Sequence, residues 1–330
     1  MRVRAWRALA AIAALLTLCG CSMTQLAYDN LDTLVHWELR DYVRLNDRQS
    51  AQFDAGFDAA WAWHRHSELP KYADDLRALA AALDAPLSRT DLEALRARLR
   101  AHQRQTMARI AELACDLGPS LDDRQVASLL AKFEADQADY ARRAVDVPAA
   151  RQRRDAEREL LKQLRRWLGT VTPTQRTLIS DWSAERPLVN GIWLDTRRQW
   201  RTTLADVLAA RTEPTFCTRL SPLIVERDAT LTQAQADALD ANQARWLDLT
   251  EALQTTLTSS QRDTLRARLL ELTRDLDALS ASEHAGEPEP ASAPEAETGT
   301  APDAPAAPEA PPPPTAAAPH ALGVIPQTIV

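Results

Sequence analysis

Glycine and alternating β-branched residues are scarce in this sequence. Of the 8 glycines among 330 residues, those between residues 22 and 280 are Gly56, Gly118, Gly169 and Gly191. Alanine, leucine, arginine and glutamine dominate this part of the chain, and all four are good helix formers. The composition therefore predicts an all-α fold.

The sequence also lacks the signatures of several functional classes. Its net charge of -7 gives no overall positive field of the kind that nucleic-acid-binding proteins use. It contains no glycine-rich phosphate loop, no nucleophile elbow and no His-Glu-x-x-His zinc motif. We therefore expect no nucleic-acid partner, no catalytic residues, no resident metal and no cofactor.

The apolar run near the N-terminus, Ala8 to Leu18, is too short to span a bilayer of roughly 30 Å. It follows three arginines and leads into Leu18-Cys19-Gly20-Cys21, which resembles a bacterial lipobox. A basic start, a short apolar run and a small residue before the cut are typical of an export signal. We expect residues 1–20 to be a signal peptide and Cys21 to be lipidated. The alternative is an ordinary cleaved signal with a free periplasmic product.

A lipidated Cys21 would anchor the chain almost irreversibly, because a bacterial lipoprotein carries several acyl chains. Ser22 follows the cysteine, and by resemblance to Gram-negative sorting signals it favours the outer membrane over the inner one. The expected location is therefore the periplasmic face of the outer membrane.

The character of the chain changes after Ser280. Prolines crowd the remaining residues, among them the run Pro311 to Pro314, and alanine and glutamate fill most of the rest. No periodic apolar face exists there to offset the entropy of ordering. We expect residues 281–330 to form a disordered Pro/Ala/Glu-rich tail, with a helical domain over residues 21–280.

One local pattern recurs through the helical part: an apolar residue, a helix-capping residue, two spacers, and then Gln or Asp. Each occurrence is a capping box, in which the first side chain accepts from a free N-H of the first turn and the last reaches back to the cap. The pattern predicts six helix starts, at Asn46/Gln49, Ser88/Asp91, Asp122/Gln125, Thr172/Gln175, Thr232/Gln235 and Thr258/Gln261.

Heptad-like leucine stripes follow most of these starts. They predict about nine or ten helices joined by short turns, packed as an antiparallel bundle or as two stacked sub-bundles with a soft boundary near residues 145–151. Pro70 is expected to break or kink the segment from residue 46 to 84, because proline cannot donate to a helix.

Two resemblances bear on the class of protein. The capping pattern resembles that of the Spy and CpxP type periplasmic proteins, which are chaperones and stress modulators. A closer resemblance, to an uncharacterised proteobacterial lipoprotein family with a domain of unknown function, covers most of the mature chain. It is carried by Tyr28 to Asp32, His36-Trp37, Asp41-Tyr42, Trp63-His64-Arg65, Glu68 to Tyr72, and Trp193 to Trp200 around Arg197 and Arg198. It implies a helical lipoprotein and brings no established activity.

His64, His66 and Glu68 are the only ligand-like cluster in the sequence. On a helix, His64 and Glu68 share a face and His66 points elsewhere. A metal site would need a third ligand, so we favour a polar patch packed on nearby tryptophans. A metal-dependent or hydrolytic enzyme centred on His64 and Glu68 is the alternative function.

Cys115 and Cys217 are the only cysteines beyond the lipobox. An oxidising compartment permits a disulfide between them, and two buried thiols are the other interpretation.

A locally basic stretch supplies candidate partner-binding residues: Arg153, Arg154, Arg158, Arg165 and Arg166. It is either a solvated face with intrahelical ion pairs or a surface for acidic envelope partners. Trp63, His64, Arg197 and Arg198 are further candidates, and the tryptophans are either core or a client groove. The expected function is a non-enzymatic binding, scaffolding or chaperone-like lipoprotein. Its expected partners are the membrane through Cys21 and an envelope protein, lipopolysaccharide or client polypeptide.

Overall fold

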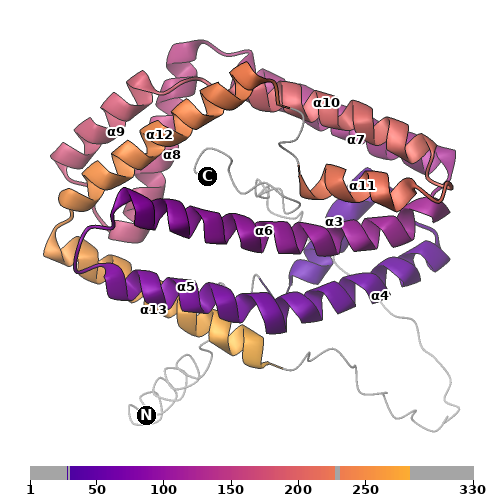
Figure 1. The fold of residues 1–330 in the computed structure, drawn as a ribbon, viewed down its shortest axis with the longest axis horizontal. Coiled ribbons are helices and arrows are strands. Elements are labelled where there is room, and N and C mark those ends of the chain that lie inside the picture. The colour runs from indigo at the N-terminus through magenta and orange to yellow at the C-terminus, as the bar shows by residue number, and fades with distance from the viewer. Residues whose placement is uncertain (1–27, 29, 227–230, 283–330) are drawn as a thin grey trace, which may run out of the picture.

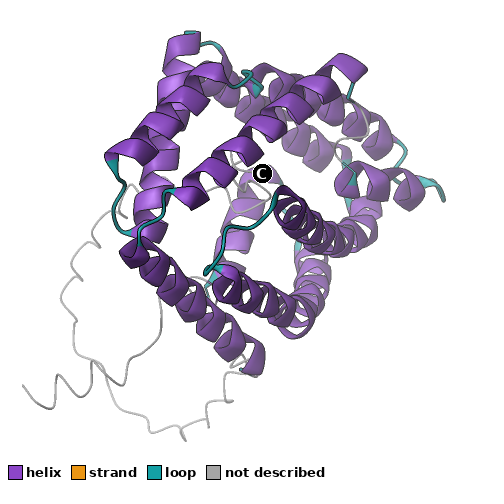
Figure 2. Ribbon diagram, turned by 60° about the vertical axis from the view of Figure 1, so that its left-hand side comes forward, coloured by secondary structure: helices purple, strands orange, loops and turns teal. Residues whose placement is uncertain are grey.

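The computed structural model describes residues 28, 30–226 and 231–282, and every regular element within them is a helix (Figure 2). This confirms the predicted all-α class. With the continuous segment α4, η1 and α5 taken as one rod, the described residues form ten helices, as predicted. The predicted signal peptide, Cys21 and residues 283–330 of the tail predicted for 281–330 lie outside the described residues, and Ala281 ends α13.

The helices alternate with short turns along the chain (Figure 1). The first half comprises α3 (Leu31–Tyr42), α4 (Asp47–Trp63), the π-helix η1 (His64–Glu68), α5 (Leu69–Ala82), α6 (Arg89–Leu117), the 3-10 helix η2 (Gly118–Ser120), α7 (Asp123–Tyr140) and the π-helix η3 (Ala141–Val145). The second half comprises α8 (Ala149–Leu168), α9 (Pro173–Glu185), α10 (Asn190–Ala209), α11 (Phe216–Val225), α12 (Gln233–Thr255) and α13 (Ser259–Ala281). The turn at 146–148 falls within the expected boundary, and the division into sub-bundles stays a prediction.

All six predicted capping boxes are present, with both reciprocal hydrogen bonds formed in each. They begin α4, α6, α7, α9, α12 and α13. Local chemistry therefore fixes the start of six helices before any tertiary contact is considered.

Four of the boxes interlock in pairs, which the sequence pattern did not predict. The amides of Gln49 and Gln125 donate to one another's oxygens at 3.0 and 2.7 Å, joining the starts of α4 and α7. Gln175 and Gln261 do the same at 3.0 and 2.9 Å, joining α9 to α13. Each glutamine also donates to a backbone carbonyl just before its partner's box. The same five-residue motif thus caps a helix and ties it to another.

Pro70 kinks the predicted segment without breaking it. It lies in the first turn of α5, directly after the π-helix η1 that joins α4 to α5. Proline has no backbone N-H to donate, and the wider turn of the π-helix accommodates the missing hydrogen bond.

The hydrophobic core is divided among four clusters. One joins α6, α7, α10 and α11; a second joins α8, α9 and α12; a third joins α3, α4, α6 and α7; and a fourth joins α5 to α13. Trp182 belongs to the second cluster, and Trp200 donates from Nε1 to the carbonyl of Leu223 at 2.8 Å beside the first. Trp37 instead is 54% exposed. Among the described tryptophans, Trp182 is therefore buried, Trp37 is exposed and the others are half-buried.

Candidate functional site

A ladder of aromatic rings runs along α4 toward η1. His36 of α3 meets Phe53 edge-on, and Phe53, Phe57 and Trp61 stack in succession with ring centroids 5.8 Å apart. Tyr28 stacks on Trp61 at 4.1 Å and closes the ladder. The rings face one another because they recur every four residues on one face of the helix.

The π-helix η1 receives the far end of this ladder. Tyr28 Oη lies 3.0 Å from His64 Nδ1, and the guanidinium of Arg65 lies over the Tyr28 ring. Burial lowers the pKa of His64 although the charge of Glu68 acts to raise it. Burial therefore favours the neutral form of His64, whose Nδ1 is within hydrogen-bond distance of the tyrosine hydroxyl.

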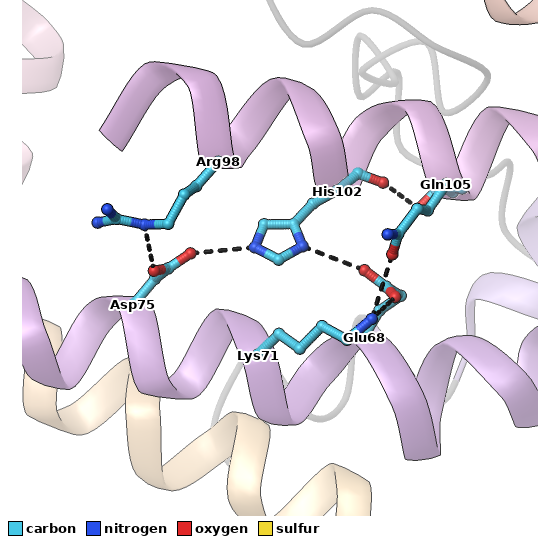
Figure 3. Close-up of polar contacts among 7 residues, drawn as sticks. Glu68, Lys71, Asp75, Arg98, His102 and Gln105 are labelled. Carbon is cyan, nitrogen blue, oxygen red and sulfur yellow. Dashed lines mark hydrogen bonds and ion pairs between the residues drawn. The ribbon is translucent and has the colours of Figure 1, made fainter. Parts of the chain in front are cut away.

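A polar seam joins η1 and α5 to α6 (Figure 3). Glu68 is fully buried, and its carboxylate lies 2.6 Å from Lys71 Nζ and 3.3 Å from His102 Nδ1. The other ring nitrogen of His102 lies 3.0 Å from Asp75, which also accepts from Arg98 Nε at 2.9 Å. Gln105 accepts from Lys71 at the other end of the seam.

The charged groups of the seam face one another, although Glu68 Oε2, 3.3 Å from His102 Nδ1, accepts no hydrogen bond from the described residues. Glu68, Lys71 and Asp75 recur at helical spacing along one face, and Arg98, His102 and Gln105 recur likewise on α6, so the two stripes meet as complementary rows. Sequence reasoning singled out Glu68 but missed Asp75 and His102. The matched spacing of the two stripes is visible in the sequence. The sequence does not show that α5 packs against α6, and this packing is what brings the stripes together.

His66 does not join this seam. Its Nδ1 lies 3.1 Å from the carbonyl of Ser280, on the side of α13. Within the described residues, no group of three His, Cys, Asp or Glu side chains is arranged to hold a metal ion. The enzyme hypothesis centred on His64 and Glu68 stays a hypothesis.

The basic stretch forms an exposed face of α8. Arg154, Arg158 and Arg165 line an open depression of about 380 Å³ together with Glu157 and Leu161. Arg158 pairs with Asp155 at 2.6 Å, whereas no ion pair involving Arg154 or Arg165 is formed within the described part of the chain. The face therefore combines intrahelical pairing with guanidinium groups open to solvent.

Not every arginine of that stretch is available to a partner. Arg153 donates from Nη1 to the carbonyls of Ser183 and Arg186 at 2.6 and 3.0 Å, so it fastens α8 to the end of α9. Arg166 is exposed beside Arg165. The prediction of a basic surface thus divides into one structural arginine and four exposed ones.

The remaining candidate residues lie on other helices. Trp63, at the end of α4, packs under the guanidinium of Arg109 at 5.0 Å. Arg197 on α10 lies over the Tyr140 ring at 4.1 Å, and burial lowers its pKa. Arg198 is exposed and lies 3.6 Å from Asp195. The structure therefore does not gather Trp63, His64, Arg197, Arg198 and the basic stretch into one site.

The two cysteines face one another across α6 and α11 as free thiols, Cys115 buried and Cys217 exposed. Cys115 Sγ lies 3.6 Å from Ser221 Oγ, one turn along α11 from Cys217. The pKa of the Cys217 thiol is raised to about 11, first by desolvation of the sulfur and then by its hydrogen bond with Cys115. The alternative of two buried thiols is therefore wrong, because Cys217 is exposed. The disulfide stays a prediction.

The fold and its surfaces define a class: an all-helical domain in which no described helix is apolar enough over sufficient length to cross a bilayer. A family of unknown function, DUF6279, matches residues 41–233. Because the match covers more than half of the sequence, the chain belongs to this family, as the second resemblance implied. No curated protein and no solved structure matches the chain. The resemblance to Spy and CpxP thus rests on the capping pattern alone.

Proposed function

We propose that this protein is a lipid-anchored, non-enzymatic binding protein of the outer membrane, and that the exposed basic face of α8 binds an acidic envelope component. The observation that carries the proposal is the depression on α8. Arg154, Arg158 and Arg165 surround it, and two of these three guanidinium groups have no carboxylate partner among the described residues.

The charge pattern supports this choice over the other polar regions. The polar seam pairs its charges internally, and the guanidinium of Arg197 lies over the Tyr140 ring. Guanidinium groups open to solvent can instead bind phosphate or carboxylate in bidentate fashion. On a molecule with a net charge of -7, such a group of exposed arginines is a local site of attraction for anions.

The lipobox and the fold support anchoring as the second part of the proposal. A lipid on Cys21 would hold the helical domain at the membrane surface, where a binding protein meets its partner without diffusing away. Metabolic labelling with a palmitate analogue tests this directly. The wild-type protein should be labelled and recovered with outer membranes, and Cys21→Ser should abolish the labelling.

Two simple polyanions test the binding surface. We expect the purified mature protein to bind both fluorescent polyglutamate and polyphosphate, with affinity that falls as salt increases. The double variant Arg154→Gln, Arg165→Gln should weaken binding about 5- to 10-fold, since each exposed ionic contact is worth up to about 1 kcal/mol. Preference for one probe distinguishes carboxylate from phosphate ligands.

A matched control removes the same charge elsewhere. Arg142 and Arg143 are exposed in η3, directly after α7, and both pair with Asp139. Arg142→Gln, Arg143→Gln should leave binding nearly unchanged. Equal losses in the two double variants would show that only net charge matters, and would contradict a site on α8.

A further inference from the structure

The first and last residues that the structure describes bind neighbouring side chains of the same π-helix. Tyr28 Oη lies 3.0 Å from His64 Nδ1. Ser282 accepts from Arg65 through its hydroxyl at 2.8 Å, and the Arg65 guanidinium also lies over the Tyr28 ring at 5.3 Å. The first and last described residues therefore both lie at η1.

The position of Tyr28 limits how far η1 can be from a lipid anchor. Seven residue steps separate Cys21 from Tyr28. A fully extended chain covers at most about 3.5 Å per residue, so the reach is at most about 25 Å. If Cys21 carries the lipid, as the proposed function holds, η1 lies within about 25 Å of the anchoring point in the membrane.

The basic face of α8 lies at the opposite end of α13. The last turn of α13 contacts η1 through Ser280, whereas its first turn interlocks with α9 through Gln261. Gly169, just after α8, lies against Thr264 near that same first turn. A helix of 23 residues is about 35 Å long. η1 and the end of α8 therefore lie near opposite ends of α13, and Figure 1 shows α8 apart from the junction of α4 with α5.

We propose that the η1 pole, defined as the partly or fully exposed residues Trp63, His66 and Arg109 at and beside η1, is the surface that faces the lipid bilayer, and that α8 points away from it. This inference rests on the anchor of the proposed function. The chemistry of the pole fits a headgroup layer, since Trp63 is partly exposed beneath the Arg109 guanidinium and His66 is exposed. Amphipathic rings and cationic side chains are typical of residues at a membrane interface. The acidic partner of α8 is then a component other than the lipid of the anchoring membrane.

Energy transfer to the membrane tests the orientation. The full mature lipoprotein is reconstituted into vesicles of phosphatidylethanolamine and phosphatidylglycerol that contain an acceptor-labelled lipid. A donor dye is attached through His66→Cys at the pole or through Arg158→Cys on α8, both in a Cys217→Ser background because Cys217 is exposed. Transfer should be severalfold stronger from residue 66 than from residue 158.

A longer tether provides a matched control. Insertion of a Gly/Ser segment between Cys21 and Tyr28 keeps the anchor and the fold but removes the limit on reach. It should reduce transfer from residue 66 toward the level seen from residue 158. No change on insertion would contradict the role of the short tether in setting the orientation.

The outcomes separate this inference from the proposed function. Lipidated protein that associates with vesicles but transfers equally well from both positions, or better from residue 158, overturns the orientation and leaves the anchor intact. Protein that carries no lipid and does not associate with vesicles overturns the anchor and the orientation together. Neither result affects binding of polyanions to α8, which is measured separately in solution.

Discussion

The polar seam between α5 and α6 and the basic face of α8 are both rich in charge. They differ in whether the charged side chains have partners of opposite charge. In the seam, a fully buried Glu68 is contacted by Lys71 and His102, and each further charge finds its partner across the helix pair. On α8, Arg154 and Arg165 border an open depression with no ion pair within the described residues.

This difference teaches which charges hold the fold and which remain for a partner. A buried charge is tolerated only when it is paired, so loss of one member leaves the other exposed to the full cost of desolvation. An exposed arginine contributes little to stability, because water solvates it equally well in the unfolded chain. Stability should therefore respond to the seam and binding to α8.

The largest effect on stability is expected at Glu68. Glu68→Ala should lower the free energy of unfolding by about 3 kcal/mol, because Lys71 and His102 lose a buried partner. The matched control is Glu157→Ala on α8, which should change it by less than about 0.5 kcal/mol. Urea denaturation followed by circular dichroism measures both. Equal losses would contradict the prediction that the seam stabilises the fold more than α8 does.

The interlocked capping boxes extend the comparison to uncharged groups. Gln261 is 1% exposed and shares two amide hydrogen bonds with Gln175, whereas Gln235 caps α12 with no interlocking partner in the described chain. Gln261→Ala should cost about 2 kcal/mol, since it leaves a buried amide and a carbonyl without partners. Gln235→Ala should cost about 0.5 kcal/mol. Thermal unfolding of the two variants gives the order, and a reversed order would contradict the role of the interlock.

A smaller, pH-dependent effect is expected at His64. Burial lowers its pKa from the ordinary value of 6.5, so the folded protein favours the neutral ring. The stability that this gives is complete above the ordinary pKa and is lost as the pH falls toward the lowered one. His64→Asn removes the titration but keeps an acceptor for Tyr28. Between about pH 7.5 and 5.5, wild-type stability should fall more steeply than that of the variant. Parallel slopes would show that His64 does not titrate in this interval.

The smallest effect on stability is expected on α8 itself. Arg154→Gln, Arg165→Gln should change the free energy of unfolding by less than about 0.5 kcal/mol while weakening polyanion binding. A large loss of stability would mean that these arginines belong to the structure, like Arg153, and would remove the contrast on which the proposed function depends.

The sequence alone predicted much of the fold, because capping is local. Each box is written within five residues, so the starts of α4, α6, α7, α9, α12 and α13 were all predicted correctly. The pairing of Gln49 with Gln125 could not be predicted, since it depends on which helix starts meet in space. The site was less predictable for the same reason: His102 and Asp75 gain their meaning only from the packing of α5 against α6. Arg153 looked like its neighbours in sequence and proved structural because α9 lies beside it.

The contacts of Tyr28 and Ser282 with η1 have a mechanical consequence. A force applied between Tyr28 and Ser282, the first and last residues that the structure describes, would act on two contacts of η1. Both residues attach to adjacent side chains of one π-helix, His64 and Arg65. The tension would therefore act first on the contacts at η1 and on the fourth hydrophobic cluster, against which Tyr28 packs, before it reached the other three clusters.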